Sequence, residues 1–188
     1  MENIEKKQKK VFLLCGVPGS GKSTWARNHL TKNAEWISRD KVRFSIIKDS
    51  EEYFSHEEEV FNAFIAYINW ALNEDSIDTI YIDATHINTA SRRKVLKKIQ
   101  KNRISELNCV CFIVPLETCI ERNSQRDGMA YVPESVIERM YNSYFLPTSN
   151  EPFNWIYLVD ENGKIKTIMM GGAIPASGKE PNGENNSV

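Results

Sequence analysis

The segment Gly16–Ser23 constrains this chain most, because it fits the pattern G-x-x-x-x-G-K-[ST] at every position. The apolar residues 10–15 before it predict a buried strand, and a helix is expected over 22–30. In that context glycines let the backbone wrap around a phosphate with its N–H groups pointing inward, and the helix N-terminus adds partial positive charge. The segment therefore predicts a phosphate-binding loop (P-loop) for a nucleoside triphosphate.

Two side chains of this loop carry specific expectations. Lys22 would reach the β- and γ-phosphates, and the Ser23 hydroxyl would ligate Mg²⁺. The alternative is a glycine-rich turn with an exposed lysine. Together with two arginines discussed below, the residues expected to hold the triphosphate are Gly16, Pro18, Gly19, Ser20, Gly21, Lys22, Ser23, Thr24, Arg122 and Arg126.

The hydrophobic rhythm of the rest of the chain alternates between strand and helix periods. Strands are expected at 10–15, 35–38, 79–83, 107–114 and 155–159, with room for an edge strand at 164–169. Further helices are expected from Asp40 through 47, and at 55–73, 88–102, 116–126 and 133–145. Strands joined by crossover helices predict an α/β fold, with a parallel sheet covered by helices on both faces.

Length and composition fit one ordinary domain, because the chain has 188 residues and 41% of them are hydrophobic. We expect a single P-loop domain over 1–169, with a lid at about 122–133. The tail 170–188 is expected to be disordered, since Gly, Pro, Asn and Ser replace the hydrophobic rhythm there.

Asp40 can cap the helix that follows it, and Ser55 with Glu58 would form a capping box for the helix at 55–73.

Net charge, the length of apolar runs and the cysteines limit the partners and the compartment that we expect for the chain. The net charge is −1, with 24 basic and 25 acidic residues, so a nucleic acid would have to be held by a local patch. No apolar run approaches the roughly 18 to 20 residues of a membrane span, so no membrane partner is expected. The cysteines form no C-x-x-C pair and predict buried thiols in the cytoplasm: Cys15, Cys109, Cys111 and Cys119.

Three absences narrow the class of P-loop protein. The chain lacks the Asn-Lys-x-Asp motif with which GTPases read guanine, and it lacks a transporter-type signature. Asp83 ends a strand and is followed by Ala84, where ATPase motors usually place a glutamate that activates water. A small kinase remains, in which an acceptor other than water takes the γ-phosphoryl group.

The acceptor side is predicted from the carboxyl ends of the strands, where ligands of parallel sheets collect. Asp40 follows the second strand and can accept the proton of an attacking hydroxyl. Arg43 lies on the same helix face and could hold an anionic group of the acceptor. Asp83 suits Mg²⁺ coordination through water or orientation of the acceptor, and Thr85 follows it into the pocket. The alternative for Asp40 and Arg43 is a helix cap and a surface cation.

Other charged or polar residues have both functional and structural interpretations. Arg122 and Arg126 share a face of a helix that Gly128 breaks, so the segment could close over the triphosphate or form a solvated helix. His86 could contact substrate, or it forms ordinary hydrogen bonds. The basic residues within 92–103 could bind a phosphate backbone or form a solvated helix face.

The chain resembles the kinase module of phage-type polynucleotide 5′-kinases over about residues 11–147. The resemblance rests on the P-loop with Thr-Trp-Ala-Arg after it, on Ser-Arg-Asp-Lys-Val-Arg at 38–43, and on Asp-Ala-Thr-His-Ile-Asn at 83–88. Arg-Asn-Ser-Gln-Arg at 122–126 with Val-Pro at 132–133 completes it. The resemblance implies an ATP- and Mg²⁺-dependent kinase acting on the 5′-hydroxyl of DNA or RNA ends.

The resemblance also implies roles for individual residues. It makes Asp40 the general base, and it assigns to Arg43 the phosphate next to the 5′-terminal nucleoside. Arg126 becomes the lid arginine on the ATP phosphates, and Asp83 an active-site carboxylate. His86 stands where the family tends to have Asn, so the acceptor pocket could differ.

Some questions stay open at this stage. The Asp-x-Asp-Gly-Thr motif of the bifunctional family's phosphatase domain is absent, so no 3′-phosphatase activity is expected. The family often forms oligomers, and self-association is left open. Two alternatives to the polynucleotide kinase are a small-molecule alcohol or nucleoside kinase of the same fold, and a nucleotide-binding module without catalysis.

Overall fold

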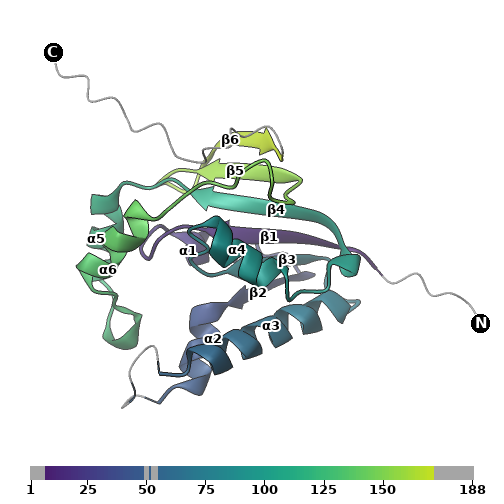
Figure 1. Cartoon of the computed structure of the whole chain (residues 1–188), viewed down its shortest axis with the longest axis horizontal. Helices are drawn as coiled ribbons and strands as arrows, with labels where there is room; N and C mark the ends of the chain where they lie inside the picture. Colours follow the sequence, from purple (N-terminus) through teal and green to yellow (C-terminus); the bar gives the residue numbers. More distant parts are fainter. Residues whose placement is uncertain (1–6, 49–50, 52–54, 172–188) are drawn as a thin grey trace, which may run out of the picture.

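A six-stranded sheet forms the centre of the molecule, with strand order β2-β3-β1-β4-β5-β6 (Figure 1). The structure is a computed structural model and describes residues 7–48, 51 and 55–171. The first five strands pair in parallel, and β6 pairs antiparallel with β5 at the edge. The strands are β1 (Lys9–Cys15), β2 (Ala34–Ser38), β3 (Thr79–Asp83), β4 (Ile104–Phe112), β5 (Trp155–Val159) and β6 (Ile165–Met170).

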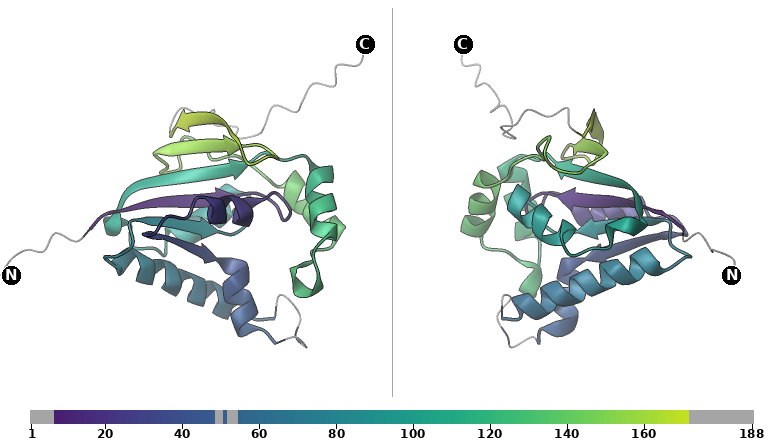
Figure 2. Two further views of the ribbon diagram at one scale, coloured as in Figure 1. Left: turned by 180° about the vertical axis from the view of Figure 1, so that it is seen from behind. Right: turned by 45° about the vertical axis from the view of Figure 1, so that its right-hand side comes forward.

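Helices cover both faces of this sheet, as the alternating rhythm predicts (Figure 2). One buried cluster lies between the sheet and α2–α4, and a second lies between the sheet and α1, α5 and α6. The helices are α1 (Lys22–Asn28), α2 (Arg39–Ile46), α3 (Glu57–Asn73), α4 (Thr89–Leu96), α5 (Leu116–Ser124) and α6 (Glu134–Asn142). Short 3-10 helices span Lys101–Arg103 and Gly128–Ala130.

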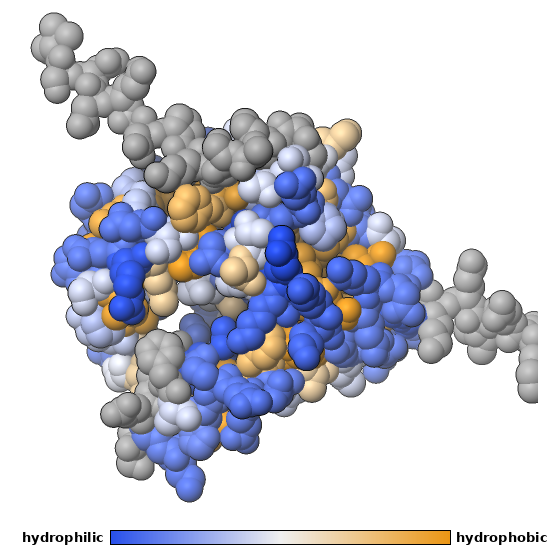
Figure 3. Space-filling view, in the orientation of Figure 1, coloured by the Kyte–Doolittle hydropathy of each residue, from blue (hydrophilic) through white to orange (hydrophobic). Residues whose placement is uncertain are grey.

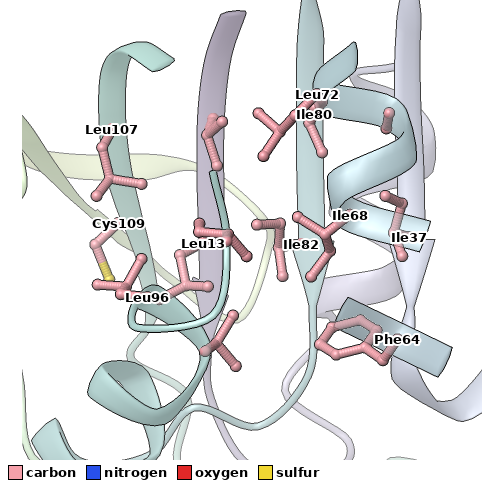
Figure 4. Close-up of a cluster of buried hydrophobic side chains, with 14 of the residues drawn as sticks. Leu13, Ile37, Phe64, Ile68, Leu72, Ile80, Ile82, Leu96, Leu107 and Cys109 are labelled. Carbon is pink, nitrogen blue, oxygen red and sulfur yellow. The ribbon is translucent and has the colours of Figure 1, made fainter. Parts of the chain in front are cut away.

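The central strand β1 feeds both clusters, because successive side chains of a strand point to opposite faces. Leu13 packs with the α3 and α4 side, and Leu14 with the α1 side. Figure 4 shows Leu13 and Ile82 of neighbouring strands facing Ile68 of α3 and Leu96 of α4. A strand buried on both faces reads as a continuous apolar run, which explains why this strand was predictable. The four cysteines are buried and free, as the sequence predicts.

Two expected helix caps are wrong. Ser38, and not Asp40, is the N-cap of α2, and its hydroxyl accepts a hydrogen bond from the Lys41 amide at 3.4 Å. Asp40 therefore lies inside the first turn, where a negative charge is favoured near the helix N-terminus. The N-cap of α3 is His56, so the capping box of Ser55 and Glu58 does not form.

The helix expected over 88–102 is shorter than predicted. Asn88 caps α4, with a reciprocal hydrogen bond to Ser91. The helix ends at Leu96, because the following turn is tied to α3 instead: the Gln100 amide donates to Asn69 Oδ1 at 2.9 Å. Most of the tail expected to be disordered, from residue 172 on, lies outside the described residues.

The carboxyl ends of the central strands bring the predicted site together. Asp83 at the end of β3 is in register with Leu14 of β1 and with Ser38 of β2. Gly16 and Asp40, which follow those strands, therefore start from the same edge of the sheet. Figure 1 shows α5 and α6 beyond this edge. No helix in the described part of the chain has the length and apolar character that a membrane span needs.

Candidate active site

The P-loop has the backbone geometry that its glycines predict. Gly19 and Gly21 have φ values of 82° and 91°, in the left-handed region that side chains disfavour. A Cβ at Gly19 would lie 2.1 Å from the backbone oxygen of Cys119, so the loop packs directly on α5. The helix α1 begins at Lys22, immediately after the loop, and points its N-terminus at the space where a phosphate would bind.

The Lys22 ammonium lies at the centre of the candidate site. Its side chain is buried, and Nζ donates hydrogen bonds to Val17 O at 2.8 Å and to Ser20 Oγ at 3.3 Å. Both acceptors are uncharged oxygens of the P-loop. A bound phosphate would replace them as the partner of the Lys22 ammonium. Burial lowers the pKa of Lys22, because desolvation disfavours the charged form.

Two carboxylates and one arginine act on the same ammonium. Asp83 and Asp40 raise the pKa of Lys22 against the effect of burial, and the Arg126 guanidinium lowers it further. These groups come from β3, from α2 and from the segment after α5, and all of them lie within electrostatic reach of Lys22. The structure thus gathers four of the residues that the sequence singled out around one point, in a region where Figure 3 shows the surface hollowed between α2 and the α5–α6 pair.

Ser23 and Asp83, the predicted metal-binding residues, are in direct contact. Ser23 Oγ donates a hydrogen bond to Asp83 Oδ2 at 2.7 Å, and the Asp83 side chain is buried. A hydroxyl and a carboxylate side by side at a phosphate-binding loop are the hard oxygen ligands that Mg²⁺ prefers. Trp36 Nε1 also donates to Asp83 Oδ2, at 3.0 Å, which fixes the carboxylate from the β2 side.

Arg43 lies next to the site but points to another partner. It is buried, and its NH1 group forms an ion pair with Glu57 at the start of α3. The same carboxylate also binds Arg39, at 2.5 Å. Glu57 therefore holds both arginines of α2. An acceptor phosphate could bind Arg43 only by sharing or displacing Glu57, and the clamp role of Arg43 stays a prediction.

Arg122 lies near the C-terminal end of α5 and Arg126 just after it, on the side of the P-loop where α5 packs. A side-chain nitrogen of Arg122 lies 3.8 Å from the position of a Cβ at Gly21, and its NH2 group donates to Glu161 O at 2.7 Å. The turn after α5 is held by Asn123, which donates to Val132 O at 2.7 Å and accepts from the Val132 amide at 3.1 Å. Closure of this segment as a lid stays a prediction.

A hollow of about 300 Å³ adjoins the P-loop beneath Arg122. It lies between α1, the end of β4 and the turn after β5. Its lining residues are Ser20, Gly21, Thr24, Trp25, Asn28, His29, Phe112, Arg122, Glu161, Asn162 and Gly163. The aromatic rings and the adjoining phosphate loop suit the nucleoside part of a nucleotide.

Thr85 and His86 connect the site to β1. The amide of Gly16 donates to Thr85 O at 2.8 Å, and His86 Nδ1 bonds Leu14 O at 2.9 Å. His86 is buried with a φ of 43°, and burial lowers the pKa of its imidazole. Its hydrogen bond joins the loop after β3 to β1, the strand that leads into the P-loop, so His86 helps to hold these two segments together.

Sequence reasoning missed several groups that contact the site. Trp36 is one, because nothing in its strand indicates that its indole reaches Asp83. Glu57 is another, since an acidic residue in the first turn of a helix gives no sign that it pairs with two arginines of another helix. The turn Glu161–Gly163 could have been found, because it follows a predicted strand and therefore lies on the ligand-binding edge.

The matching family model agrees with this geometry. Residues 11–147 match the AAA_33 family, whose description is "AAA domain". The chain belongs to this family. The matched range contains the P-loop, the candidate carboxylates Asp40 and Asp83, and the arginines Arg122 and Arg126.

Solved structures extend the comparison. A chain of the Pnkp1/Rnl/Hen1 RNA repair complex is similar at 26% identity with a TM-score of 0.61; the match covers 76% of this AAA-domain chain and 46% of that chain. The protein thus spans less than half the length of that relative. A fungal RNA kinase (18% identity, TM-score 0.54, 81% and 75% covered) shares the fold.

A nucleotide-bound structure shares the same architecture. Kti12 of Chaetomium thermophilum, in complex with ADP-AlF3, is 16% identical with a TM-score of 0.55, and the match covers 80% of this chain and 88% of that one. These likenesses show that the AAA domain has the fold of a P-loop kinase. Such a fold implies nucleotide binding at the loop that contains Lys22.

Proposed function

We propose that this protein transfers the γ-phosphoryl group of ATP to the 5′-hydroxyl of a DNA or RNA end. The observation that supports the proposal most is that Asp40 lies in the first turn of α2, whose N-cap Ser38 is in register with Asp83. Asp83 is in turn the carboxylate that contacts Ser23 of the P-loop. A carboxylate able to accept a proton and a cation able to hold phosphate then share one site. The similarity to a chain of an RNA repair complex adds support for a nucleic-acid acceptor.

In the proposed reaction, Asp40 accepts the proton of the acceptor hydroxyl. The hydroxyl oxygen forms a bond to the γ-phosphorus, the bond from that phosphorus to its bridging oxygen breaks, and ADP leaves. Lys22 and Arg126 stabilise the negative charge on the transferring group. Asp40 is exposed, so a hydroxyl can approach it from solvent.

Ser23 and Asp83 would hold Mg²⁺ in this scheme. A bound ion would supply positive charge to offset the negative charge that develops on the phosphate oxygens. The P-loop backbone and Lys22 bind the phosphates, and the hollow between Trp25 and Arg122 receives the nucleoside of the donor. Arg43 would hold the acceptor phosphate next to the reacting nucleoside, in exchange with Glu57.

The test is an acceptor screen with ATP that is radiolabelled on the γ-phosphate. We expect label in DNA or RNA oligonucleotides that carry a 5′-hydroxyl. The same oligonucleotides with a 5′-phosphate are the matched control, and they should stay unlabelled. Label that enters only sugars, nucleosides or other small alcohols would contradict the polynucleotide acceptor. ATP binding without labelling of any acceptor would contradict the kinase itself.

A further inference from the structure

The basic segment 92–103 is divided by the fold into two groups of cations. Arg92 and Arg103 are buried and paired, with Glu151 at 2.7 Å and with Asp75 at 3.2 Å. The remaining cations are exposed, and within residues 7–48, 51 and 55–171 none of them forms an ion pair: Arg93, Lys94, Lys97, Lys98 and Lys101. We call these five the α4 track.

The α4 track begins beside the proposed general base. Arg39, the chain neighbour of Asp40, has its guanidinium carbon 5.7 Å from the centroid of the Phe61 ring. Lys94 Nζ lies 4.4 Å from the centroid of the same ring. The start of α2 and the middle of α4 therefore both contact one residue of α3, and Lys94 lies on the side of α3 that also carries Arg39.

The α4 track then runs away from the site, along α3. Lys97 and Lys98 follow α4 directly, and their amides still bond back to Arg93 O and Val95 O of its last turn. The turn after them is fixed to α3, because Asn69 Nδ2 donates to Lys98 O at 3.2 Å. Lys101 begins the next short helix. Figure 3 shows hydrophilic side chains gathered over α4 in the middle of this face.

The charge of this surface needs a partner. Like charges three or four positions apart on a helix repel one another and destabilise the helix. Among the described residues, folding gives these five no ion pair in return, whereas Arg92 pairs with the buried Glu151. Arg103 donates to the buried Leu72 O and pairs with the exposed Asp75. The phosphate backbone of a polynucleotide supplies one negative charge per nucleotide and can neutralise such a row of cations.

We propose that the α4 track binds the phosphate backbone of a single-stranded polynucleotide whose 5′-hydroxyl end lies at Asp40. This inference rests on the proposed function and adds that the acceptor is gripped at several phosphates beyond its first. The cations form a single row, which fits the single phosphate backbone of one strand. A duplex would present two backbones. The acceptor class is thus an oligonucleotide rather than a nucleoside 3′-monophosphate.

The experiment compares wild type with the triple variant Lys97→Gln, Lys98→Gln, Lys101→Gln, which spares Lys94 because Lys94 also packs on Phe61. The matched control removes three exposed lysines from other elements: Lys10→Gln, Lys32→Gln, Lys164→Gln. Fluorescence anisotropy measures binding of labelled single-stranded DNA and RNA with a 5′-hydroxyl, at several salt concentrations. Kinetics measure kcat/KM for such an oligonucleotide and for a nucleoside 3′-monophosphate.

We expect the triple variant to lower the ratio of the two kcat/KM values about tenfold or more. The slope of log Kd against log salt should fall by about 2, because each lost contact to a single strand removes about 0.7. The control should keep the wild-type ratio and slope. An unchanged ratio and slope in the triple variant would overturn the α4 track, as would wild-type binding of the oligonucleotide no tighter than of the monophosphate.

The outcome for the α4 track is separable from that for the kinase. If wild type phosphorylates oligonucleotide and monophosphate with equal kcat/KM, the track is refuted while the 5′-kinase stands. If wild type labels neither acceptor, the kinase is refuted, and the anisotropy still decides whether the track binds a strand. Oligomerisation that changes in the triple variant without any change in oligonucleotide binding would instead make this face a protein contact and would refute the track.

Discussion

Ser23 Oγ and Asp83 Oδ2 lie 2.7 Å apart, although 60 positions of sequence separate the two residues. The contact joins the P-loop helix α1 to the end of β3. The fold thus brings together the two oxygens expected to serve Mg²⁺. Trp36 holds the same carboxylate oxygen at 3.0 Å and limits its freedom to turn away.

The first prediction concerns this pair. Ser23→Ala and Asp83→Asn should each raise the Mg²⁺ concentration for half-maximal activity. The double variant should raise it by less than the product of the single effects, because the two groups serve one ion. Titration of phosphoryl transfer with Mg²⁺ in all four proteins measures this. Strictly multiplicative effects would show that the two residues act at separate places.

The strands were the most predictable part of the fold. β3 and β5 have the bounds that their apolar runs predict. For β3 this follows because a strand buried on both faces leaves a continuous hydrophobic signal. The end of α4 was not predictable in the same way, since it depends on Asn69 of α3, which lies far away in the sequence. Likewise Ser38 and Asp40 are both good caps by residue type, and only the backbone decides between them.

The P-loop pattern likewise predicted the core of the candidate site but not its surroundings. Lys22, Ser23 and Asp83 meet because their motif and their strand ends leave few other arrangements. The pairing of Arg43 with Glu57 depends on how α2 packs against α3, and no local pattern reports that angle. The same is true of Arg92, which was counted among surface cations and is fully buried against Glu151.

The second prediction concerns that buried ion pair. Arg92 donates to both carboxylate oxygens of Glu151 at 2.7 Å, and these hydrogen bonds raise the pKa of Arg92 although burial opposes the charge. Glu151→Gln should lower the free energy of unfolding by about 3–5 kcal/mol, because it leaves a buried charge without its counter-ion. Urea denaturation followed by circular dichroism measures the change.

Asp75→Asn provides the comparison for this measurement. Asp75 pairs with Arg103 but its side chain is 69% exposed, so water replaces the lost partner and the effect should stay below about 1 kcal/mol. If both substitutions cost the same, burial does not set the strength of the Arg92 pair.

The third prediction concerns pH. Burial lowers the pKa of His86 below 6.5, so the unfolded chain takes up a proton at His86 before the folded protein does. Stability is therefore complete above pH 6.5 and decreases as the pH falls toward the folded value. His86→Asn, which tolerates the φ of 43° found there, should reduce the loss of unfolding free energy between about pH 7.5 and about pH 5.5.

Urea denaturation of wild type and His86→Asn at the two pH values measures the difference. A His86→Asn protein that loses as much stability on acidification as wild type would remove His86 as the source.

The fourth prediction concerns Arg43. If Arg43 exchanges Glu57 for the acceptor phosphate, Arg43→Gln should raise the KM for a nucleoside 3′-monophosphate about tenfold or more, with little change in ATP affinity. Steady-state kinetics with the acceptor and isothermal titration with ATP measure the two effects. Lys41→Gln on the same helix is the control. An ATP affinity that falls in parallel with acceptor use would place Arg43 on the donor side or in the fold alone.

The most direct test of the account is Asp40→Asn. The amide keeps the shape of the side chain but cannot take a proton, so the rate of transfer to a 5′-hydroxyl oligonucleotide in a single turnover should fall by about 10² to 10⁴. ATP should bind with nearly wild-type affinity, and Glu138→Gln, an exposed carboxylate on α6, should transfer at the wild-type rate. Transfer by Asp40→Asn at the wild-type rate would contradict the account, because the proposed general base would then have no part in the reaction.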